Sequence, residues 1–168
     1  MWQPILRCRG LALCIIFAVV AVTMLVPGTA ISRVDVTLEV KREMKFGEFA
    51  ADISGGGTVV LSAFADTVTQ SGPITNFGGT VTRARVQING QNRAYVIVSL
   101  PSSITIRKGT SSNYLTVNNF TMDQTNPIRL NNQGVAIINI GATLNITTNQ
   151  KFGNYNDENE FTFTVEYL

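Results

Sequence analysis

The feature that most constrains the fold of this chain is the period of its apolar residues. Past residue 30, no segment of helical length repeats its apolar positions every three to four residues. Short runs rich in Val, Ile, Thr and Phe recur instead, separated by clusters of Gly, Asn, Ser and Pro. In several runs apolar and polar residues alternate, which places one face of a strand in a core and the other in water. The pattern predicts an all-β domain with no helices.

The runs define the strands that we expect. Their ranges are 34–40, 44–49, 58–64, 80–89, 94–100, 104–107, 115–120, 128–130, 134–148 and 161–167. Gly141 is the expected break in the ninth range, which holds either one long strand or two bulged ones. Asn89-Gly90 is the strongest short turn signal in the chain. Many short strands at this spacing predict a β-sandwich or barrel.

The N-terminal segment predicts export. Arg7 and Arg9 precede an unbroken apolar run over residues 11–26, and small residues follow at Gly28 and Ala30. A basic start, an apolar stretch and a small-residue exit are together typical of a secretory signal peptide. An uncleaved membrane anchor is the alternative, since about 16 apolar residues is marginal for a span.

Cleavage after Ala30 gives the expected domain organisation. Residues 1–30 form the signal peptide, and residues 31–168 form a single sandwich domain. We expect the processed protein to reside in the periplasm, on the cell surface or outside the cell, with no stable membrane insertion.

Composition excludes most kinds of chemistry. The whole chain has 13 Lys+Arg, 11 Asp+Glu and no histidine. Cleavage removes two arginines and both cysteines, Cys8 and Cys14, and leaves 11 basic and 11 acidic side chains. Without a thiol or an imidazole, disulfides, Cys/His metal sites and Ser-His-Asp catalysis are excluded. The neutral charge also argues against nucleic acid as a partner.

The remaining polar groups show no catalytic or ligand-binding pattern. Asp157, Glu158 and Glu160 form the only acidic cluster, but they lack the spacing of a calcium loop. Paired carboxylates for glycoside hydrolysis would require residues such as Asp66 and Asp123 to meet in space, and no motif marks them. We therefore expect no catalytic, cofactor-binding or metal-binding residues, and no enzyme activity.

Three arginines are candidates for a small patch that binds a ligand or a partner. Arg83 and Arg85 share a strand face, and Arg93 lies just past the next turn. A solvated strand face is the preferred interpretation, because such surface charges usually interact weakly.

The two alternating ends of the expected domain are its most informative feature. Four apolar side chains share one face of the first strand and form the candidate donor strand: Val34, Val36, Leu38 and Val40. Four more share one face of the last strand and form the candidate C-terminal pairing strand: Phe161, Phe163, Val165 and Tyr167. Such a strand can complete the sheet of another molecule, with main-chain hydrogen bonds and a row of filled pockets. The alternative is that each is simply an edge strand of its own sandwich.

Several short motifs in this order resemble the DUF4402 family. They are Phe46-Gly47, Gly56-Gly57-Thr58-Val59, Gly78-Gly79, residues 137–144 (Ile-Ile-Asn-Ile-Gly-Ala-Thr-Leu), Gly153-Asn154-Tyr155 and a closing Phe-Thr-Val-x-Tyr that ends at Tyr167. The family is similar to fimbrial subunits of the chaperone–usher and common-pilus type and to spore-coat-U-like proteins. That similarity implies an immunoglobulin-like sandwich completed by a strand from a neighbour.

The expected function is therefore structural. We expect a secreted pilus or surface-fibre subunit whose partners are other copies of itself or related subunits, with a periplasmic chaperone during assembly. The alternative is a self-contained carbohydrate-binding or adhesin module, for which Tyr95, Tyr114 and Tyr155 are the available stacking groups. A carboxylate-dependent hydrolase is a third and weaker candidate.

Overall fold

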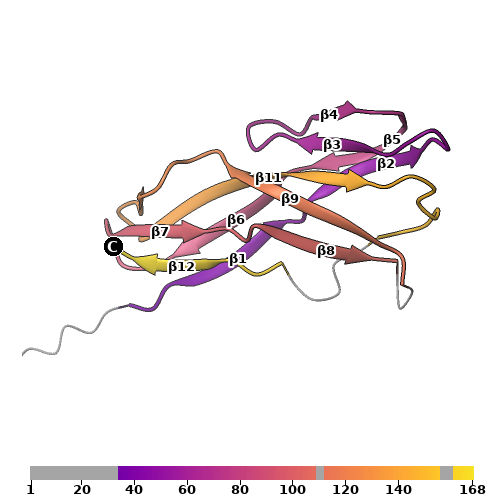
Figure 1. The fold of residues 1–168 in the computed structure, drawn as a ribbon. Helices are drawn as coiled ribbons and strands as arrows, with labels where there is room; N and C mark the ends of the chain where they lie inside the picture. Colours follow the sequence, from indigo (N-terminus) through magenta and orange to yellow (C-terminus); the bar gives the residue numbers. More distant parts are fainter. Residues whose placement is uncertain (1–33, 109–111, 156–160) are drawn as a thin grey trace, which may run out of the picture. The chain divides into compact units, whose positions relative to one another are not determined.

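The computed structural model describes residues 34–108, 112–155 and 161–168, all within one compact unit, Arg33–Leu168. The described part of the chain consists of β-strands joined by turns and loops, without a helix (Figure 1). The strands are β1 (Thr37–Arg42), β2 (Lys45–Ala51), β3 (Gly57–Leu61), β4 (Val68–Ser71), β5 (Ile74–Thr82), β6 (Ala84–Asn89), β7 (Tyr95–Ser99), β8 (Ser103–Arg107), β9 (Tyr114–Met122), β10 (Ile128–Arg129), β11 (Val135–Ile146) and β12 (Thr164–Tyr167). The all-β prediction is confirmed, and the predicted signal peptide lies outside the described residues.

The largest sheet is organised around β11, the longest strand. Its order is β1-β6-β11-β3-β4, and β9 pairs with the other side of β11 and carries β8. β11 is therefore paired along both of its edges. Ile140 of β11, for example, lies opposite Ala84 of β6 on one edge and opposite Met122 of β9 on the other. A second sheet has the order β10-β7-β12, and β2 and β5 form a two-stranded third sheet. All these pairings are antiparallel.

Two apolar clusters hold the layers together. In the first, alternate residues of β6 and β11 pack against β7 and β10 of the second sheet: Ala84, Val86, Ile88, Val96, Val98, Ile128, Leu130, Ile138 and Ile140. In the second, β3, β9 and β11 pack against Ile74 of β5, with Phe46 and Phe49 of β2 at its margin. Burial in β6 alternates residue by residue, as expected for a strand with one face in a core.

The predicted boundaries differ from the observed ones at a few places. The expected strand over residues 80–89 is divided at Arg83 into β5 and β6, which belong to different sheets. β4 was not predicted, and the range 134–148 contains one long strand, β11. Asn89-Gly90 does begin a turn, but the turn joins two layers, because β6 and β7 are not paired with each other.

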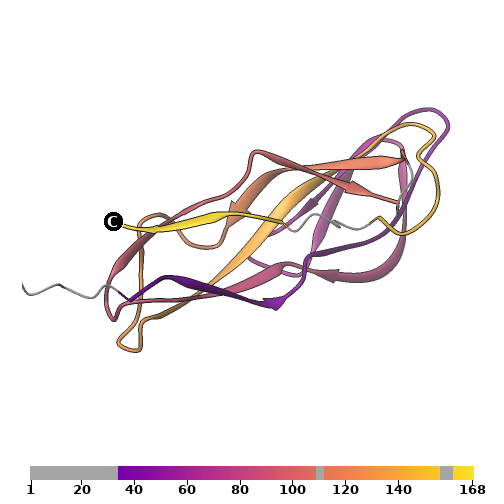
Figure 2. The same cartoon turned by 90° about the horizontal axis from the view of Figure 1, so that it is seen from below.

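The first and last strands run along the same side of the domain. Figure 2 shows β1 in indigo and β12 in yellow on the side that faces the viewer, and Figure 1 shows them next to each other. β1 is an edge strand of the largest sheet and β12 is an edge strand of the second sheet. The two layers of the sandwich are therefore bordered on this side by the two ends of the described domain.

Candidate functional site

β1 pairs with β6 alone among the described strands. Leu38 lies opposite Ile88, and residues that face each other in an antiparallel pair point to the same side of the sheet. Because Ile88 is buried in the first core, Leu38 points to the inner face too. It is nevertheless 41% exposed, and Val40 on the same face is 65% exposed. The inner face of β1 is therefore apolar but largely uncovered.

Only one member of the candidate donor strand contributes to the core. Val36 packs against the first cluster, whereas Val34 is 55% exposed. The structure thus pairs Leu38 and Val40 with β6 of the same chain, whereas Val34 and Val36 precede β1. Three of the four apolar side chains stay accessible. Donation to a neighbour would require β1 to leave β6, and it remains a prediction.

β12 lies on the same side of the domain as β1, at the edge of the second sheet (Figure 1 and Figure 2). It pairs with β7 on one side, and no described strand pairs with its other edge. The candidate C-terminal pairing residues Phe161, Phe163, Val165 and Tyr167 are half-buried against the first core. The Phe161 ring lies 4.9 Å from that of Phe120 and 5.6 Å from that of Phe163, measured between ring centroids.

We call the strip of surface between these strands the seam. It is bordered by Val36, Leu38 and Val40 on one side and by Phe161, Phe163 and Val165 on the other. A row of apolar groups between two strand edges is suited to receiving an extended segment, which can add hydrogen bonds as well as buried area.

The Tyr167 hydroxyl joins three segments at one end of the seam. It accepts a hydrogen bond from the backbone N–H of Gln91 at 2.7 Å and donates one to the carbonyl of Val34 at 2.6 Å. A Cβ at position 90 would lie 2.5 Å from this hydroxyl, so a glycine there leaves it room. Tyr167 therefore ties β12 to the link after β6 and to the chain just before β1.

Asp66 anchors the other end of β1. Both of its oxygens accept from the Arg42 guanidinium at 2.9 Å, and Oδ1 also accepts from the backbone N–H of Arg83 at 3.0 Å. The Arg83 N–H, helped by the Arg42 guanidinium and opposed by some desolvation, holds the pKa of Asp66 below its usual range. We call Arg42, Asp66 and Arg83 the Asp66 clamp. Because its carboxylate and guanidinium groups are partly exposed, the clamp is a modest anchor.

A hollow of about 450 Å³ lies where β1 continues into β2. Its lining residues are Val40, Lys41, Arg42, Glu43, Lys45, Thr80 and Thr82. The two-residue link Glu43-Met44 is held there by a hydrogen bond from Thr82 Oγ1 to the Glu43 carbonyl at 2.8 Å. The end of β1 therefore borders an open hollow on this side.

The structure does not bring together the three arginines of the candidate ligand patch. Arg83 donates to the Ala63 carbonyl at 2.9 Å, and Arg85 donates to Asn139 Oδ1 at 3.2 Å. Arg93 lies in the link after β6 and donates to Asn132 Oδ1 at 2.8 Å. The first two are structural groups, and the third belongs to a different part of the surface.

The two candidate carboxylates also have separate structural partners. Asp66 belongs to the clamp described above, whereas Asp123 accepts from the backbone N–H and the side-chain amide of Asn139 at 2.8 and 2.6 Å. These bonds satisfy the edge of β11 where β9 ends. The geometry gives neither carboxylate a catalytic partner among the described residues.

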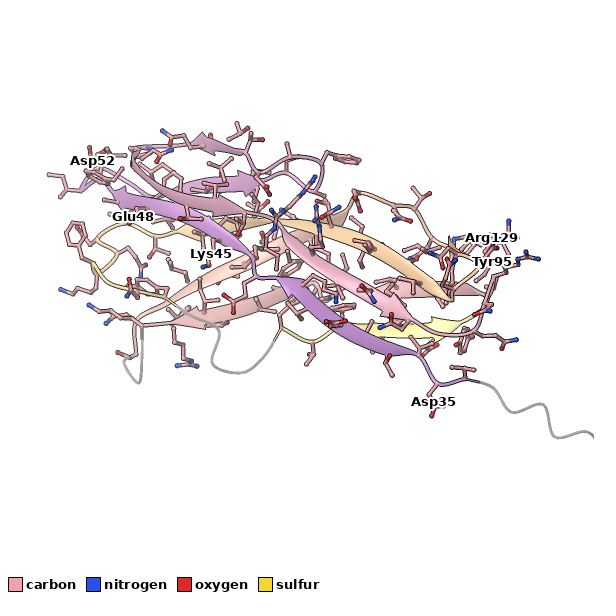
Figure 3. The ribbon with its side chains drawn as sticks, turned by 180° about the vertical axis from the view of Figure 1, so that it is seen from behind. Asp35, Lys45, Glu48, Asp52, Tyr95 and Arg129 are labelled. Carbon is pink, nitrogen blue, oxygen red and sulfur yellow. The ribbon has the colours of Figure 1, made fainter. Side chains whose placement is uncertain are left out.

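The three tyrosines that are candidates for stacking on a carbohydrate do not lie together on one surface. Gln150 Nε2 donates to the Tyr114 carbonyl at 3.3 Å and to the Tyr155 hydroxyl at 2.7 Å, which brings these two residues close. Tyr95 lies elsewhere: Figure 3 shows it beside Arg129 at one end of the domain, with Asp52 at the opposite end.

Within the described ranges, no three His, Cys, Asp or Glu side chains gather in a way that could hold a metal ion. The acidic residues Asp157, Glu158 and Glu160 lie outside the described residues. No described helix is long and apolar enough to cross a membrane.

The fold and the seam define an all-β sandwich whose first and last strands are both edge strands. The family model of a domain of unknown function, DUF4402, matches residues 35–167, and the chain belongs to this family. No curated protein and no solved structure matches the chain.

Proposed function

We propose that the protein is an exported structural subunit whose copies assemble into a surface fibre by donating β1. In the assembled form, β1 of one copy leaves its own β6 and takes the place of β1 beside β6 of the next copy, where it borders that copy's seam. The observation that supports this most directly is that β1 is an edge strand whose inward-facing Leu38 and Val40 are largely uncovered. Exposed apolar edge strands are a recognised route to association between chains.

The burial available to such an assembly is comparable to the stability of a whole domain. Full burial of four large apolar side chains would contribute about 6–12 kcal/mol at about 1.5–3 kcal/mol each, before ordering costs. In the single chain, Val34, Leu38 and Val40 realise less than this because they remain exposed. A second copy lying against the seam can therefore gain burial that one chain does not provide.

Besides its pairing with β6, β1 is held by contacts near its two ends. Val36, just before β1, packs against the first core and would leave it with the strand. The Asp66 clamp holds the other end of β1, and Tyr167 bonds Val34 ahead of the strand. Only the link Glu43-Met44 joins it to β2. A donated strand would restore the same hydrogen bonds in the next copy, so the exchange itself costs little once the strand is free.

The last strand has the complementary role in this proposal. Phe161, Phe163 and Val165 form the wall of the seam, and Tyr167 holds the incoming strand as it holds Val34 here. A subunit with an empty seam would expose this wall and the edge of β6. A periplasmic chaperone that covers the seam until assembly is the partner we propose on the same grounds.

Deletion of residues 31–40 tests the proposal. We expect the deletion to abolish polymers, seen by size-exclusion chromatography and electron microscopy, and to leave a subunit that is soluble only with its seam covered. Because a deletion can also impair folding, a second variant carries Leu38→Thr and Val40→Thr, which keep strand propensity and remove the apolar row. Its matched control carries Thr37→Ala and Glu39→Ala on the opposite face. Polymers of normal length from the deletion or from the Leu38/Val40 variant would refute donation.

A further inference from the structure

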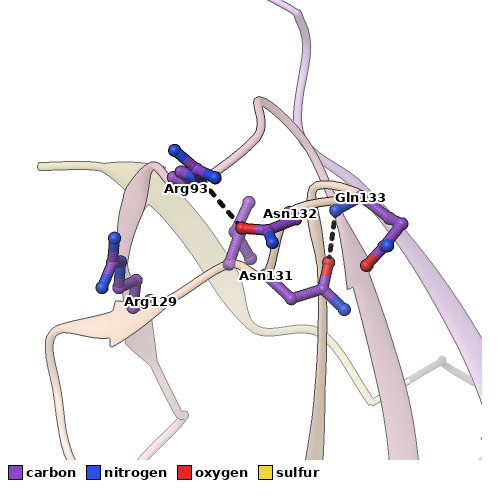
Figure 4. Close-up of a pocket in the computed structure, with 6 residues that line it drawn as sticks. Arg93, Arg129, Asn131, Asn132 and Gln133 are labelled. Atoms are coloured by element: carbon purple, nitrogen blue, oxygen red, sulfur yellow. Dashed lines mark hydrogen bonds between the residues drawn. The ribbon is translucent and has the colours of Figure 1, made fainter.

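Two links meet in a hollow at one end of the domain, away from the inner face of β1. The hollow has a volume of about 310 Å³ and is lined by Arg93, Arg129, Leu130, Asn131, Asn132 and Gln133 (Figure 4). Backbone bonds join the links: Gly90 N–H donates to the Gly134 carbonyl at 2.8 Å, and Arg93 N–H donates to the Asn131 carbonyl at 3.0 Å. The walls of the hollow are therefore fixed to each other.

Three polar side chains of the hollow, those of Arg93, Asn131 and Asn132, are held in place by local bonds. Arg93 has a φ of 59°, in the left-handed region, and its Nε donates to Asn132 Oδ1 at 2.8 Å. Asn131 Oδ1 accepts from the backbone N–H groups of Gln133 and Val135 at 2.8 and 2.9 Å. A site whose polar groups are oriented in advance loses less entropy when a ligand binds.

The side chains that line the hollow carry positive charge only. Its lining includes two arginines and no carboxylate. Within the described ranges, the ion pairs lie elsewhere, on Glu39 and Asp66. The Arg129 guanidinium carbon lies 5.9 Å from the centroid of the Tyr95 ring, and Tyr95 is 46% exposed. The hollow thus presents two guanidinium groups and side-chain amides, and the exposed Tyr95 ring lies beside it, next to Arg129 (Figure 3).

We propose that this hollow binds a single carboxylate-bearing sugar, of the uronic acid class. Guanidinium groups match the planar carboxylate, and the amides of Asn132 and Gln133 can bond hydroxyls. The Tyr95 ring offers an apolar surface to the C–H face of the sugar ring. The volume lies at the lower end of the range of about 300–1,000 Å³ that is usual for ligand pockets, which suits one sugar residue.

Two other anion classes fit the hollow less well. Inorganic phosphate would bond the arginines and the amide N–H groups, but it has no hydroxyl-bearing ring and no apolar face for Tyr95. A nucleic acid would need an extended basic surface, and the chain as a whole carries a net charge of only +2. The proposal does not depend on fibre assembly, because none of the lining residues borders the seam.

Titration of the ¹⁵N-labelled full chain with D-glucuronate and D-glucose tests the proposal. The two sugars differ at C6, where glucuronate has a carboxylate and glucose a CH₂OH group. We expect saturable shifts of the Arg93, Asn132 and Gln133 amides with glucuronate, and binding of glucose at least about tenfold weaker, as loss of a charged hydrogen bond implies. Inorganic phosphate should also bind at least about tenfold more weakly than glucuronate.

Variants locate the site. Arg93→Gln and Arg129→Gln should each weaken glucuronate binding about tenfold or more. Arg107→Gln, on β8 of a different sheet, removes the same group and should leave binding unchanged. Arg129 makes no hydrogen bond through its side chain within the described ranges, so its replacement tests binding even if Arg93→Gln disturbs its loop. Equal affinity for glucose, tighter binding of phosphate, or unchanged binding by both variants would overturn the proposal.

Discussion

At the scale of single residues, one hydroxyl and one carboxylate hold the first strand in place. Tyr167 bonds the carbonyl of Val34, just before β1, and Asp66 bonds Arg42 at the end of β1. Neither contact is a large energetic term, because both sites are exposed to solvent. Together they add to the pairing with β6 that keeps β1 in its own sheet.

Replacing Tyr167 by Phe removes only the hydroxyl. The variant loses the bonds to Gln91 and Val34, and we expect a decrease of about 1–2 kcal/mol in the free energy of unfolding. Urea denaturation measures it. Tyr95→Phe is the matched control, since no described residue bonds the Tyr95 hydroxyl, and it should change stability by less than about 0.5 kcal/mol. Equal effects of the two variants would show that Tyr167 is not an anchor.

The Asp66 clamp makes part of the stability depend on pH. The folded pKa of Asp66 is lowered, so the clamp contributes fully above the unfolded value of about 3.9 and is lost as pH falls through the folded pKa. The urea midpoint should therefore fall more steeply from pH 6 to pH 3 in the original chain than in Asp66→Asn. Asp35→Asn serves as the control and should keep the steeper dependence. Identical pH profiles for all three chains would contradict the assigned role.

At the scale of the strands, β11 organises the main sheet, and Gly141 allows β3 to approach it. A Cβ at position 141 would lie 2.3 Å from the Leu61 carbonyl oxygen and 2.5 Å from the Ala63 nitrogen. Both are backbone atoms that cannot move aside easily. The pairing of β11 with β9 also shifts register between Gly141 and Thr143.

Gly141→Ala should therefore destabilise the domain by overpacking. We expect a loss of about 1–3 kcal/mol, measured by thermal or urea unfolding. Gly78→Ala is the control, because a Cβ at position 78 would meet no atom within 4 Å. The only expected cost is that of a left-handed backbone at a residue with a side chain, a loss of about 1 kcal/mol in the free energy of unfolding. A larger loss at Gly78 than at Gly141 would contradict the packing argument.

The sequence was most informative where a strand has one buried face and clear turn residues. The expected ranges 94–100 and 104–107 differ from β7 and β8 by one residue at each boundary or less. β4 was missed because Val68 is the only apolar residue in its four positions. The division of β5 from β6 at Arg83 was missed because no Gly, Pro, Asn or Asp marks it. The apolar positions do change phase there, from Val81 before Arg83 to Ala84 after it.

The candidate sites were less accessible from the sequence. The alternation of apolar and polar residues that ends at Tyr167 is visible in the sequence. The hydrogen bonds of the Tyr167 hydroxyl are not, because they join residues 76 and 133 positions away and depend on the tertiary fold. Arg42 and Asp66 meet across 24 positions and show no motif. Arg129 was not singled out, because only the pairing of β10 with β7 places it over Tyr95.

At the scale of the whole molecule, the account depends on whether β1 pairs in its own chain or in a neighbour. Residues 39 and 87 are opposed across β1 and β6, and opposed antiparallel residues lie about 4.5–5.5 Å apart at Cα, within disulfide range. A double variant, Glu39→Cys with Gln87→Cys, can therefore record the pairing as a covalent bond. Cys8→Ser and Cys14→Ser remove the other thiols from the chain.

Oxidation of assembled material, followed by denaturing gel electrophoresis without reductant, is the most direct measurement. If β1 is donated, the double variant forms a ladder of covalent multimers, and a reductant converts the ladder to monomer. Each single-cysteine variant should form no covalent species larger than a dimer. A single band of internally cross-linked monomer from fully assembled fibres would contradict strand donation.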